Sequence, residues 1–399
     1  MTAQTTTRQL GQHHQGKRLV LFAGPHKSAS SSVQEFFMRY ASDKKTTSKH
    51  PSLVNWTWPY NPRRRSYMPR KGFAPLVVEY ENEELRNILY DTLMKVWNTT
   101  TTSNSNGGLI FGSEEYDRFG DTPWSHRNGF RSIQDILQLT KPDQFEIVVN
   151  YRVPRHQQWI SIWKQLTRTH PIPYREYLCQ DDVRTWEYLD AVANPLGLVQ
   201  AFRSKNWKTT LIDMSGVAYD KMDVAHVVAC EVLQVPCKNG WLPGLEQILQ
   251  NTKTGDPEMS NEQLDQMEWI LRQRDCSYRE TLESDDGLNI LHRHSLWENC
   301  PSTSSSSPID SSRKFQNTTF LLGVLRDQIG CGDGTVNISN WMNQETISFL
   351  QRHPRDPTSP DHMIKAAMWQ QRILFLLVVA MIAWLYRRRL KARVKHRNL

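Results

Sequence analysis

The chain has 399 residues, enough for one large domain with appendages or for two small domains. Apolar residues make up 38% of it and it contains 14 tryptophans, so it can bury a substantial core. Its formal net charge is +8, but the tail 387–399 carries seven positive charges and no acidic residue, which leaves +1 for the rest. A nearly neutral body argues against nucleic acid as the partner.

The cysteines and the glycosylation sequons bear on the compartment. Six cysteines are present, and no two have the two-residue spacing of a zinc knuckle or a redox motif. The even number permits up to three disulfides, but six free thiols in a cytosolic enzyme are equally compatible with it. Asn-X-Ser/Thr sequons occur at Asn55, Asn98, Asn317 and Asn337. They matter only if the domain enters the secretory lumen.

The first predicted elements are a strand over 19–23, a tight turn, and a helix with Val33, Phe36 and Phe37 on one face. The turn holds Gly24, Lys27 and several serines. Backbone N–H groups, the helix dipole, the lysine and the hydroxyls then converge on one point, which predicts a site for a phosphate-like oxyanion. The spacing differs from a Walker A loop, because only two residues separate Gly24 from Lys27. The alternative is a serine-rich helix cap with a surface lysine.

The region after this helix contains an irregular insertion, a helix and a strand. Residues 41–75 predict a long irregular insertion, in which Trp56, Trp58 and Tyr60 form either a sugar-stacking surface or ordinary packing. A helix over 83–97 ends at the low-complexity segment 98–106. The next strand, over 108–112, leads to Glu114, a candidate general base or one of a carboxylate pair at a helix start.

A strand over 145–151 ends at Arg152, and a helix carrying Ser161 follows it. Pro154 lies in the first turn after the strand, where a helix tolerates it. Arginine binds phosphate through two donors of its guanidinium fork, so Arg152 is a candidate anion ligand. Taken alone it reads as a surface arginine.

Alternation of strands and helices predicts an α/β fold, with a central parallel sheet between two layers of helices. The expected organisation is an N-terminal segment 1–17, an α/β domain 18–300, a Ser-rich linker 301–317, an extension 318–368, a transmembrane helix 369–386 and a basic tail 387–399. Within the domain, further elements are expected as a strand over 211–214, a helix over 224–233 and a charged helical region over 247–279.

The C-terminal segment predicts a membrane anchor. Its uncharged core, 373–386, spans only about 21 Å as a helix, short of the ~30 Å hydrocarbon core. With residues 369–372 included, and Arg372 extended toward the interface, the segment is long enough. The basic tail marks the cytosolic side, which would place the domain in a lumen. Residues 1–17 lack the apolar run of a signal peptide, so a tail-anchored protein facing the cytosol is the alternative.

The two anion-binding segments together resemble the donor site of sulfotransferases that use 3′-phosphoadenosine 5′-phosphosulfate (PAPS). Gly24-Pro25-His26-Lys27-Ser28 and the serines at 30–32 match the 5′-phosphosulfate loop of that family, while Ala29 replaces the usual glycine. Tyr-Arg-X-Pro-Arg followed by Trp-X-Ser matches its 3′-phosphate motif, with nine residues from Arg152 to Ser161 where eight are usual. The resemblance covers residues 18 to about 210.

The resemblance implies a P-loop-like fold and transfer of a sulfuryl group to a hydroxyl, on a carbohydrate acceptor, without a metal. It implies Golgi membranes, with the domain in the lumen. The catalytic candidates are Lys27, Glu114 and His26. The donor-binding candidates are Lys27, Ser28, Ala29, Ser30, Ser31, Ser32, Arg152 and Ser161. An ATP-dependent kinase and a catalytically degenerate, membrane-anchored binding module remain as alternatives.

Overall fold

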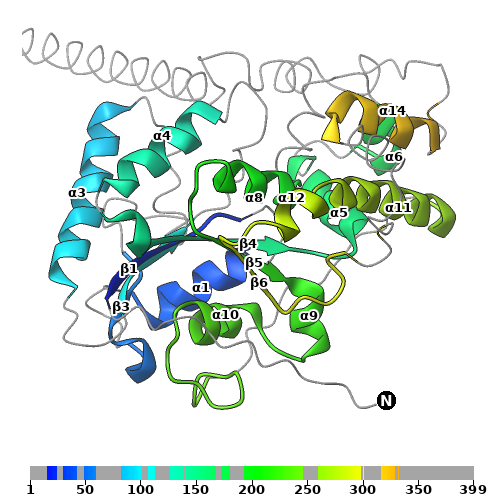
Figure 1. Cartoon of the computed structure of the whole chain (residues 1–399). Helices are drawn as coiled ribbons and strands as arrows, with labels where there is room; N and C mark the ends of the chain where they lie inside the picture. Colours follow the sequence, from blue (N-terminus) through cyan, green and yellow to red (C-terminus); the bar gives the residue numbers. More distant parts are fainter. Residues whose placement is uncertain are drawn as a thin grey trace, which may run out of the picture. The chain divides into compact units, whose positions relative to one another are not determined.

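The structure is a computed structural model, and Figure 1 shows its course. It describes residues 16–24, 30–42, 49–59, 82–100, 107–112, 126–138, 140–167, 172–179, 193–245, 259–297, 300, 316–328 and 331. The chain divides into two compact units, Met1–Val336 and Asn337–Leu399, and every described residue belongs to the first.

Six parallel strands form one sheet in the order β2-β3-β1-β4-β5-β6. Their bounds are β1 Lys17–Phe22, β2 Trp56–Thr57, β3 Gly107–Gly112, β4 Phe145–Tyr151, β5 Thr209–Asp213 and β6 Leu288–Leu291. The four central strands are almost wholly buried, as expected for a parallel sheet covered on both faces. The predicted parallel sheet is confirmed.

Within the described residues, helices connect the strands and one further helix, α14, follows β6. They are α1 Ser30–Tyr40, α3 Glu83–Thr99, α4 His126–Leu137, α5 Arg155–Leu166, α6 Tyr174–Cys179, α8 Pro195–Arg203, α9 Met214–Tyr219, α10 Val224–Val227, α11 Asn261–Ser277, α12 Arg279–Glu283 and α14 Thr318–Gln328. A π-helical turn, Val228–Val232, continues α10, and 3-10 turns occupy Pro51–Leu53 and Pro142–Gln144.

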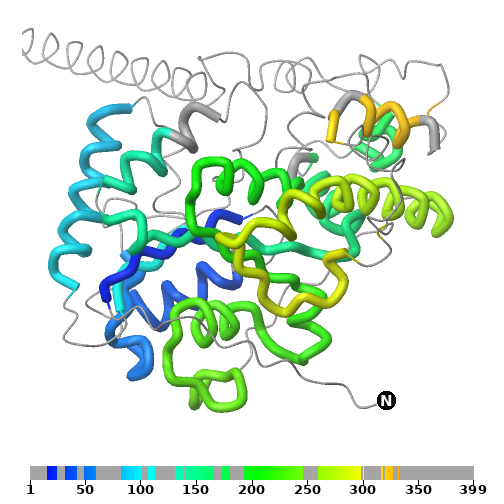
Figure 2. Tube along the Cα trace, in the orientation of Figure 1, coloured from blue at the N-terminus to red at the C-terminus, as the bar shows by residue number. Residues whose placement is uncertain are grey.

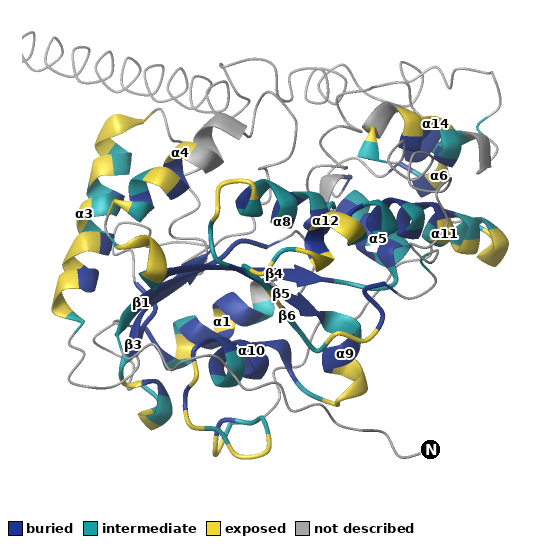
Figure 3. Ribbon diagram, in the orientation of Figure 1, coloured by how far each residue is buried: buried dark blue, intermediate teal, exposed yellow. Residues whose placement is uncertain are grey.

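Two apolar cores lie on the two faces of the sheet. Alternate residues of each central strand point to opposite faces, so Val20 and Leu21 belong to different cores. One core joins the sheet to α1 and α10, and the other joins it to α3, α4 and α8. Figures 1 and 3 show these helices on either side of the buried strands. The arrangement is therefore an α/β fold with helices on both faces of a parallel sheet.

A further group of helices packs beyond β4. The chain passes from β4 into α5, which contacts α6 and α11, and α11 contacts α14. The tube in Figure 2 shows how residues far apart in sequence meet there. A disulfide connects Cys179, the last residue of α6, to Cys331, which lies three residues after the end of α14. Residues 318–328, assigned from sequence to an extension, thus pack as α14 on α11.

All six cysteines form disulfides, Cys179–Cys331, Cys230–Cys237 and Cys276–Cys300. The even number of cysteines permits up to three disulfides, and the structure contains all three. The first bond joins residues 152 positions apart and the third bond joins residues 24 apart, so both stabilise tertiary structure by restricting the unfolded chain.

Part of the expected insertion over 41–75, residues 41–42 and 49–59, lies within the described residues. It contains the short strand β2, which pairs with β3. Trp56 and Trp58 are buried, and Trp58 stacks on Phe37 of α1 with ring centroids 6.4 Å apart. Ordinary packing is therefore the correct interpretation of these two tryptophans, and a sugar-stacking surface is wrong for them. Tyr60 lies outside the described residues.

The predicted membrane anchor, residues 369–386, also lies outside the described residues. Within the described part of the chain, no helix combines the length and the apolar character needed to cross a membrane.

Candidate functional site

The two segments that resemble a donor site follow neighbouring strands. β1 pairs in parallel with β4, so both strands end at the same edge of the sheet. From β1 the chain continues to β2 and β3 on one side, and from β4 it continues to β5 and β6 on the other. Ligands of open parallel sheets bind at the carboxyl edge, where the connections diverge in this way. The pair β1/β4 is that point.

Backbone hydrogen bonds continue the pairing beyond β1. Ala23 N donates to Val148 O at 2.9 Å, and Asn150 N donates to Gly24 O at 3.0 Å. Gly24 has φ +98°, a conformation that favours glycine over other residues. The chain thus leaves the sheet at Gly24, beside β4, whose last residue, Tyr151, directly precedes Arg152.

α1 begins shortly after this turn. Its first residues are Ser30, Ser31 and Ser32, and its first turn contains no acidic residue that would repel an anion. The N-terminal end of a helix carries a partial positive charge and N–H groups that have no partner within the helix. Of the other proposed loop residues, His26, Lys27, Ser28 and Ala29 lie outside the described residues, and so does Glu114.

β3 also ends at this edge. Gly112 pairs with Phe22, and a Cβ at this position would lie 2.1 Å from Phe22 O. No side chain fits there, so glycine allows β3 to approach the end of β1 closely. The described strand stops two residues before Glu114, on the side of β1 opposite to β4.

Arg152, a predicted ligand of the 3′-phosphate, lies within the described residues. It follows the last residue of β4 and is half-buried. Burial lowers the pKa of Arg152, and the neighbouring charge of Arg155 lowers it further. Both causes disfavour the cation, so a bound anion at this strand end would stabilise it.

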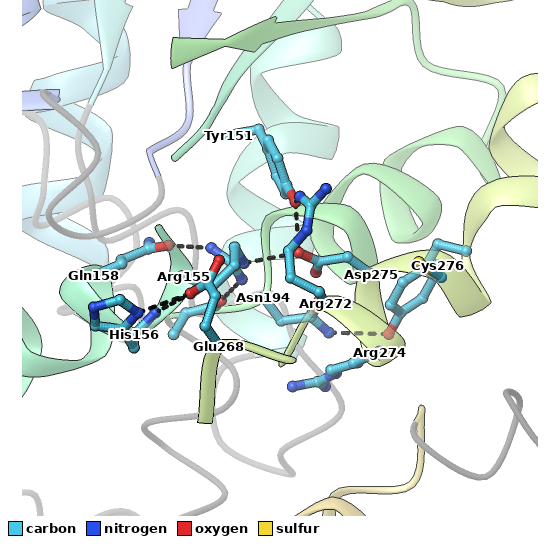
Figure 4. A network of polar contacts seen from close by, with 12 residues as sticks. Tyr151, Arg155, His156, Gln158, Asn194, Glu268, Arg272, Arg274, Asp275 and Cys276 are labelled. Carbon is cyan, nitrogen blue, oxygen red and sulfur yellow. Dashed lines mark hydrogen bonds and ion pairs between the residues drawn. The ribbon is translucent and has the colours of Figure 1, made fainter. Parts of the chain in front are cut away.

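Arg152 lies beside a cluster of polar side chains from the end of β4, α5 and α11, which we call the arginine network and define to include it. Figure 4 shows other members of this network from close by. Its members are Tyr151, Arg152, Arg155, His156, Gln158, Glu268, Arg272, Arg274 and Asp275. Tyr151 Oη donates to Asp275 Oδ2 at 2.6 Å, and Arg155 Nε lies 3.0 Å from the same oxygen. Arg272 donates to Tyr151 Oη, and Arg155 donates to Gln158 and to the carbonyl of Ala193.

The arginine network is rich in positive charge. Its described members include four arginines and two carboxylates, those of Glu268 and Asp275. Arg155, Arg272 and Arg274 are at most 8% exposed. Burial lowers the pKa of Arg274, an effect that the nearby Tyr278 and Asp275 oppose. These arginines lie at the carboxyl end of β4, the edge at which open parallel sheets bind their ligands.

Glu268 of α11 holds the start of α5. Its Oε2 accepts from the backbone N–H of His156 at 2.9 Å and lies 3.0 Å from His156 Nδ1. Burial alone would raise the pKa of Glu268, but hydrogen bonds from His156 and the charges of His156 and Arg155 outweigh burial and lower it. A carboxylate at the positive end of a helix satisfies an otherwise unpaired N–H group.

Ser161 lies on the second turn of α5 and is half-buried. Its Oγ donates to Gln157 O of the same helix at 2.7 Å. Because a serine hydroxyl has one hydrogen, binding a phosphate would require Ser161 to leave this bond. The structure therefore places Arg152 and Ser161 on consecutive elements but does not join their side chains.

A cavity among the described residues lies away from this site. A depression of about 500 Å³ is lined by Gln134, Gln138, Lys205 and Trp207, among others. Trp207 precedes the first residue of β5, so this depression is near the amino edge of the sheet. Within the described residues, no group of three histidine, cysteine or acidic side chains is arranged to hold a metal ion.

Comparison of the chain with protein-family models, with curated proteins and with solved structures finds no match.

Most of the arginine network is not predicted from the sequence. Arg155 lies within the strand-end motif, where the sequence gives it no role, and α11 is expected only as part of a charged helical region. Arg272 and Asp275 are three residues apart, so they share one face of α11, and both are buried. That spacing was the available signal, but a charged helix face more commonly contacts water.

Proposed function

We propose that this protein transfers a sulfuryl group from PAPS to a hydroxyl group, on a carbohydrate acceptor. One observation carries the proposal: the Gly24–Ser32 segment and Arg152 leave neighbouring strands at the point where the sheet connections diverge. PAPS bears anionic groups at both ends of one nucleotide, so it requires two anion sites side by side. The P-loop-like character of the fold is part of this proposal.

Each residue then has a chemical role. Lys27, Ser28, Ala29, Ser30, Ser31 and Ser32, through side chains or N–H groups, hold the 5′-phosphosulfate. Lys27 neutralises the charge that develops on the phosphate oxygen as its bond to sulfur breaks. Glu114 accepts the proton of the acceptor hydroxyl while the oxygen of that hydroxyl bonds to sulfur. His26 is the alternative base. Arg152, assisted by Ser161, holds the 3′-phosphate, and 3′,5′-adenosine bisphosphate leaves.

We also propose that the domain faces the Golgi lumen and that 369–386 anchors it to the membrane. The three disulfides support an oxidising compartment. Asn98 and Asn317 are exposed, so their sequons are accessible in the folded domain. Glycosidase treatment of the protein from sealed microsomes, with and without external protease, tests both statements. A domain that external protease digests would face the cytosol.

A second function is a binding module without catalysis. Ala29 in place of glycine, and the bond of Ser161 to its own helix, favour a site that holds nucleotide weakly. Such a module would share the fold and the membrane anchor but would not sulfate an acceptor.

Calorimetry with 3′,5′-adenosine bisphosphate tests the donor site. We expect wild-type protein to bind it and Lys27→Ala to lose at least about tenfold in affinity, the loss that follows removal of a charged hydrogen bond. Absence of binding in wild type, or no effect of Lys27→Ala, would refute the proposal. Binding without transfer of labelled sulfate from PAPS to any glycan of a panel would favour the module, and binding of Mg-ATP instead would favour a kinase.

A further inference from the structure

Asp275 contacts the chain on both sides of Arg152. Tyr151 directly precedes Arg152, and its hydroxyl donates to Asp275 Oδ2 at 2.6 Å. Arg155, three residues after Arg152, lies 3.0 Å from the same oxygen through Nε. One carboxylate oxygen therefore joins the end of β4 to the start of α5, and Arg152 lies in the short segment between the two points.

The contact is fully buried and involves a third element. Tyr151, Arg155 and Asp275 are at most 2% exposed. Asp275 belongs to α11, more than a hundred residues further along the chain, so the β4–α5 turn is held by a helix from outside the β1–β4 region. Arg272, one turn earlier on α11, donates to Tyr151 Oη and to Ser295 O. Water has no access to this cluster to substitute for a lost partner.

The arginines also pack on the tyrosine ring. The guanidinium carbons of Arg155 and Arg272 lie 5.3 and 5.9 Å from the centroid of Tyr151. These distances are within the range of cation–π attraction. The position of Tyr151, and with it the backbone that leads to Arg152, is thus determined by groups on α5 and α11 together.

We propose that Asp275, supported by Arg272, is a positioning residue for the site at Arg152, and that it sets the affinity for the 3′-phosphate of the donor. This inference rests on the proposed function. Asp275 does not touch the ligand itself. It fixes the backbone on both sides of Arg152, so the guanidinium fork meets the phosphate in one orientation. Preorganisation of this kind lowers the free-energy cost of binding.

The sign of the effect separates positioning from charge. Asp275→Asn removes a negative charge beside Arg155, so simple electrostatics predicts tighter binding of an anion. Positioning predicts weaker binding, because the neutral amide loses the ion pair with Arg155 and accepts a weaker hydrogen bond from Tyr151 than a carboxylate does. Tyr151→Phe leaves all charges in place and removes only the hydroxyl that joins β4 to Asp275.

The measurement is the ratio of two affinities, for 3′,5′-adenosine bisphosphate and for adenosine 5′-monophosphate, by calorimetry on the full chain. We expect wild type to prefer the bisphosphate, and Asp275→Asn and Tyr151→Phe each to reduce that preference about tenfold, the factor that corresponds to one hydrogen bond to a charged group. A structural role alone would lower thermal stability and leave the ratio unchanged.

Glu146→Gln is the matched control. Glu146 is a buried, ion-paired carboxylate at the amino end of the same strand. We expect this variant to lose stability and to keep the wild-type ratio. If wild type binds both nucleotides equally, the proposed function and this inference both fail. If wild type discriminates and both network variants discriminate as well as it does, only the inference fails.

Discussion

The two ends of β4 both carry buried charge, but they differ in how that charge is balanced. At the amino end, Glu146 forms ion pairs with Arg18 and Lys208 and accepts a hydrogen bond from the hydroxyl of Thr210. Arg18 Nη1 donates to Val232 O, and the side chain of Lys208 is 41% exposed to water. At the carboxyl end, the described arginines outnumber the carboxylates two to one, and three of the four are buried.

This difference distinguishes a structural cluster from one that is a candidate for binding. In the amino-end cluster, Glu146 is paired with two cations, one of which is partly exposed to water. These charges are therefore balanced without a bound ligand. Among the described residues, the arginine network holds more arginines than carboxylates, and it includes a half-buried arginine at the carboxyl edge of the sheet. A strongly perturbed group at such an edge is a candidate for binding, whereas the same perturbation elsewhere reflects an ion pair.

The largest expected effect is at the amino end. Glu146→Ala leaves Arg18 buried without its carboxylate, so we expect the free energy of unfolding to fall by about 3–5 kcal/mol. Urea unfolding followed by circular dichroism measures it. Nucleotide affinity of the folded protein should remain that of wild type. A loss of affinity in this variant would mean that the two ends of β4 are coupled.

The next effect is at the carboxyl end. Arg152→Ala should reduce the affinity for 3′,5′-adenosine bisphosphate by about 10- to 100-fold, as expected for loss of hydrogen bonds between charged groups. It should change the free energy of unfolding by less than about 1 kcal/mol, since it also removes repulsion with Arg155. Arg152→Lys, which keeps the charge but loses the fork, should be intermediate. If Arg152→Ala destabilises the fold as much as Glu146→Ala does, Arg152 has a structural role and the proposed difference between the two ends of β4 is wrong.

Acid should affect the amino end in a predictable direction. Burial alone would raise the pKa of Glu146, but the charges of Arg18 and Lys208 and its hydrogen bonds lower it below the ordinary value of 4.5. The stabilisation from Glu146 is therefore present above pH 4.5 and is lost as the pH falls through its lowered pKa. Urea unfolding of wild type and Glu146→Gln in a series of buffers should show a stability difference that shrinks with acid. A difference that grows with acid would contradict the assignment.

The smallest effect is expected away from both ends. Arg279 and Glu283 form a pair one helical turn apart, with nitrogen and oxygen 2.8 Å apart, and both side chains are 27% exposed. Arg279→Ala should lower the free energy of unfolding by no more than about 0.5 kcal/mol. Because Glu283 also contacts Arg293, a larger loss would point to a three-residue network on this surface.

The central strands and α1 could be predicted from sequence because their apolar runs are long and buried. β2 and β6 could not. β2 has two residues inside a Pro- and Arg-rich insertion, and β6 is an edge strand without a fully buried residue. The position of Arg152 at a strand end was predictable from the run before it. Its surroundings were not, because Arg272 and Asp275 reach it through tertiary contacts from α11, which the local pattern does not contain.

The disulfide from Cys179 to Cys331 has a consequence for processing. The Ser-rich segment after Cys300 lies between the two bonded cysteines in sequence. A protease that cut the chain there would produce two polypeptides that stay covalently joined, with α14 and everything up to Leu399 still linked to α6. Only reduction would separate them. A cut beyond Cys331 would instead free the C-terminal piece at once, so a gel run with and without reductant distinguishes the two cleavage sites.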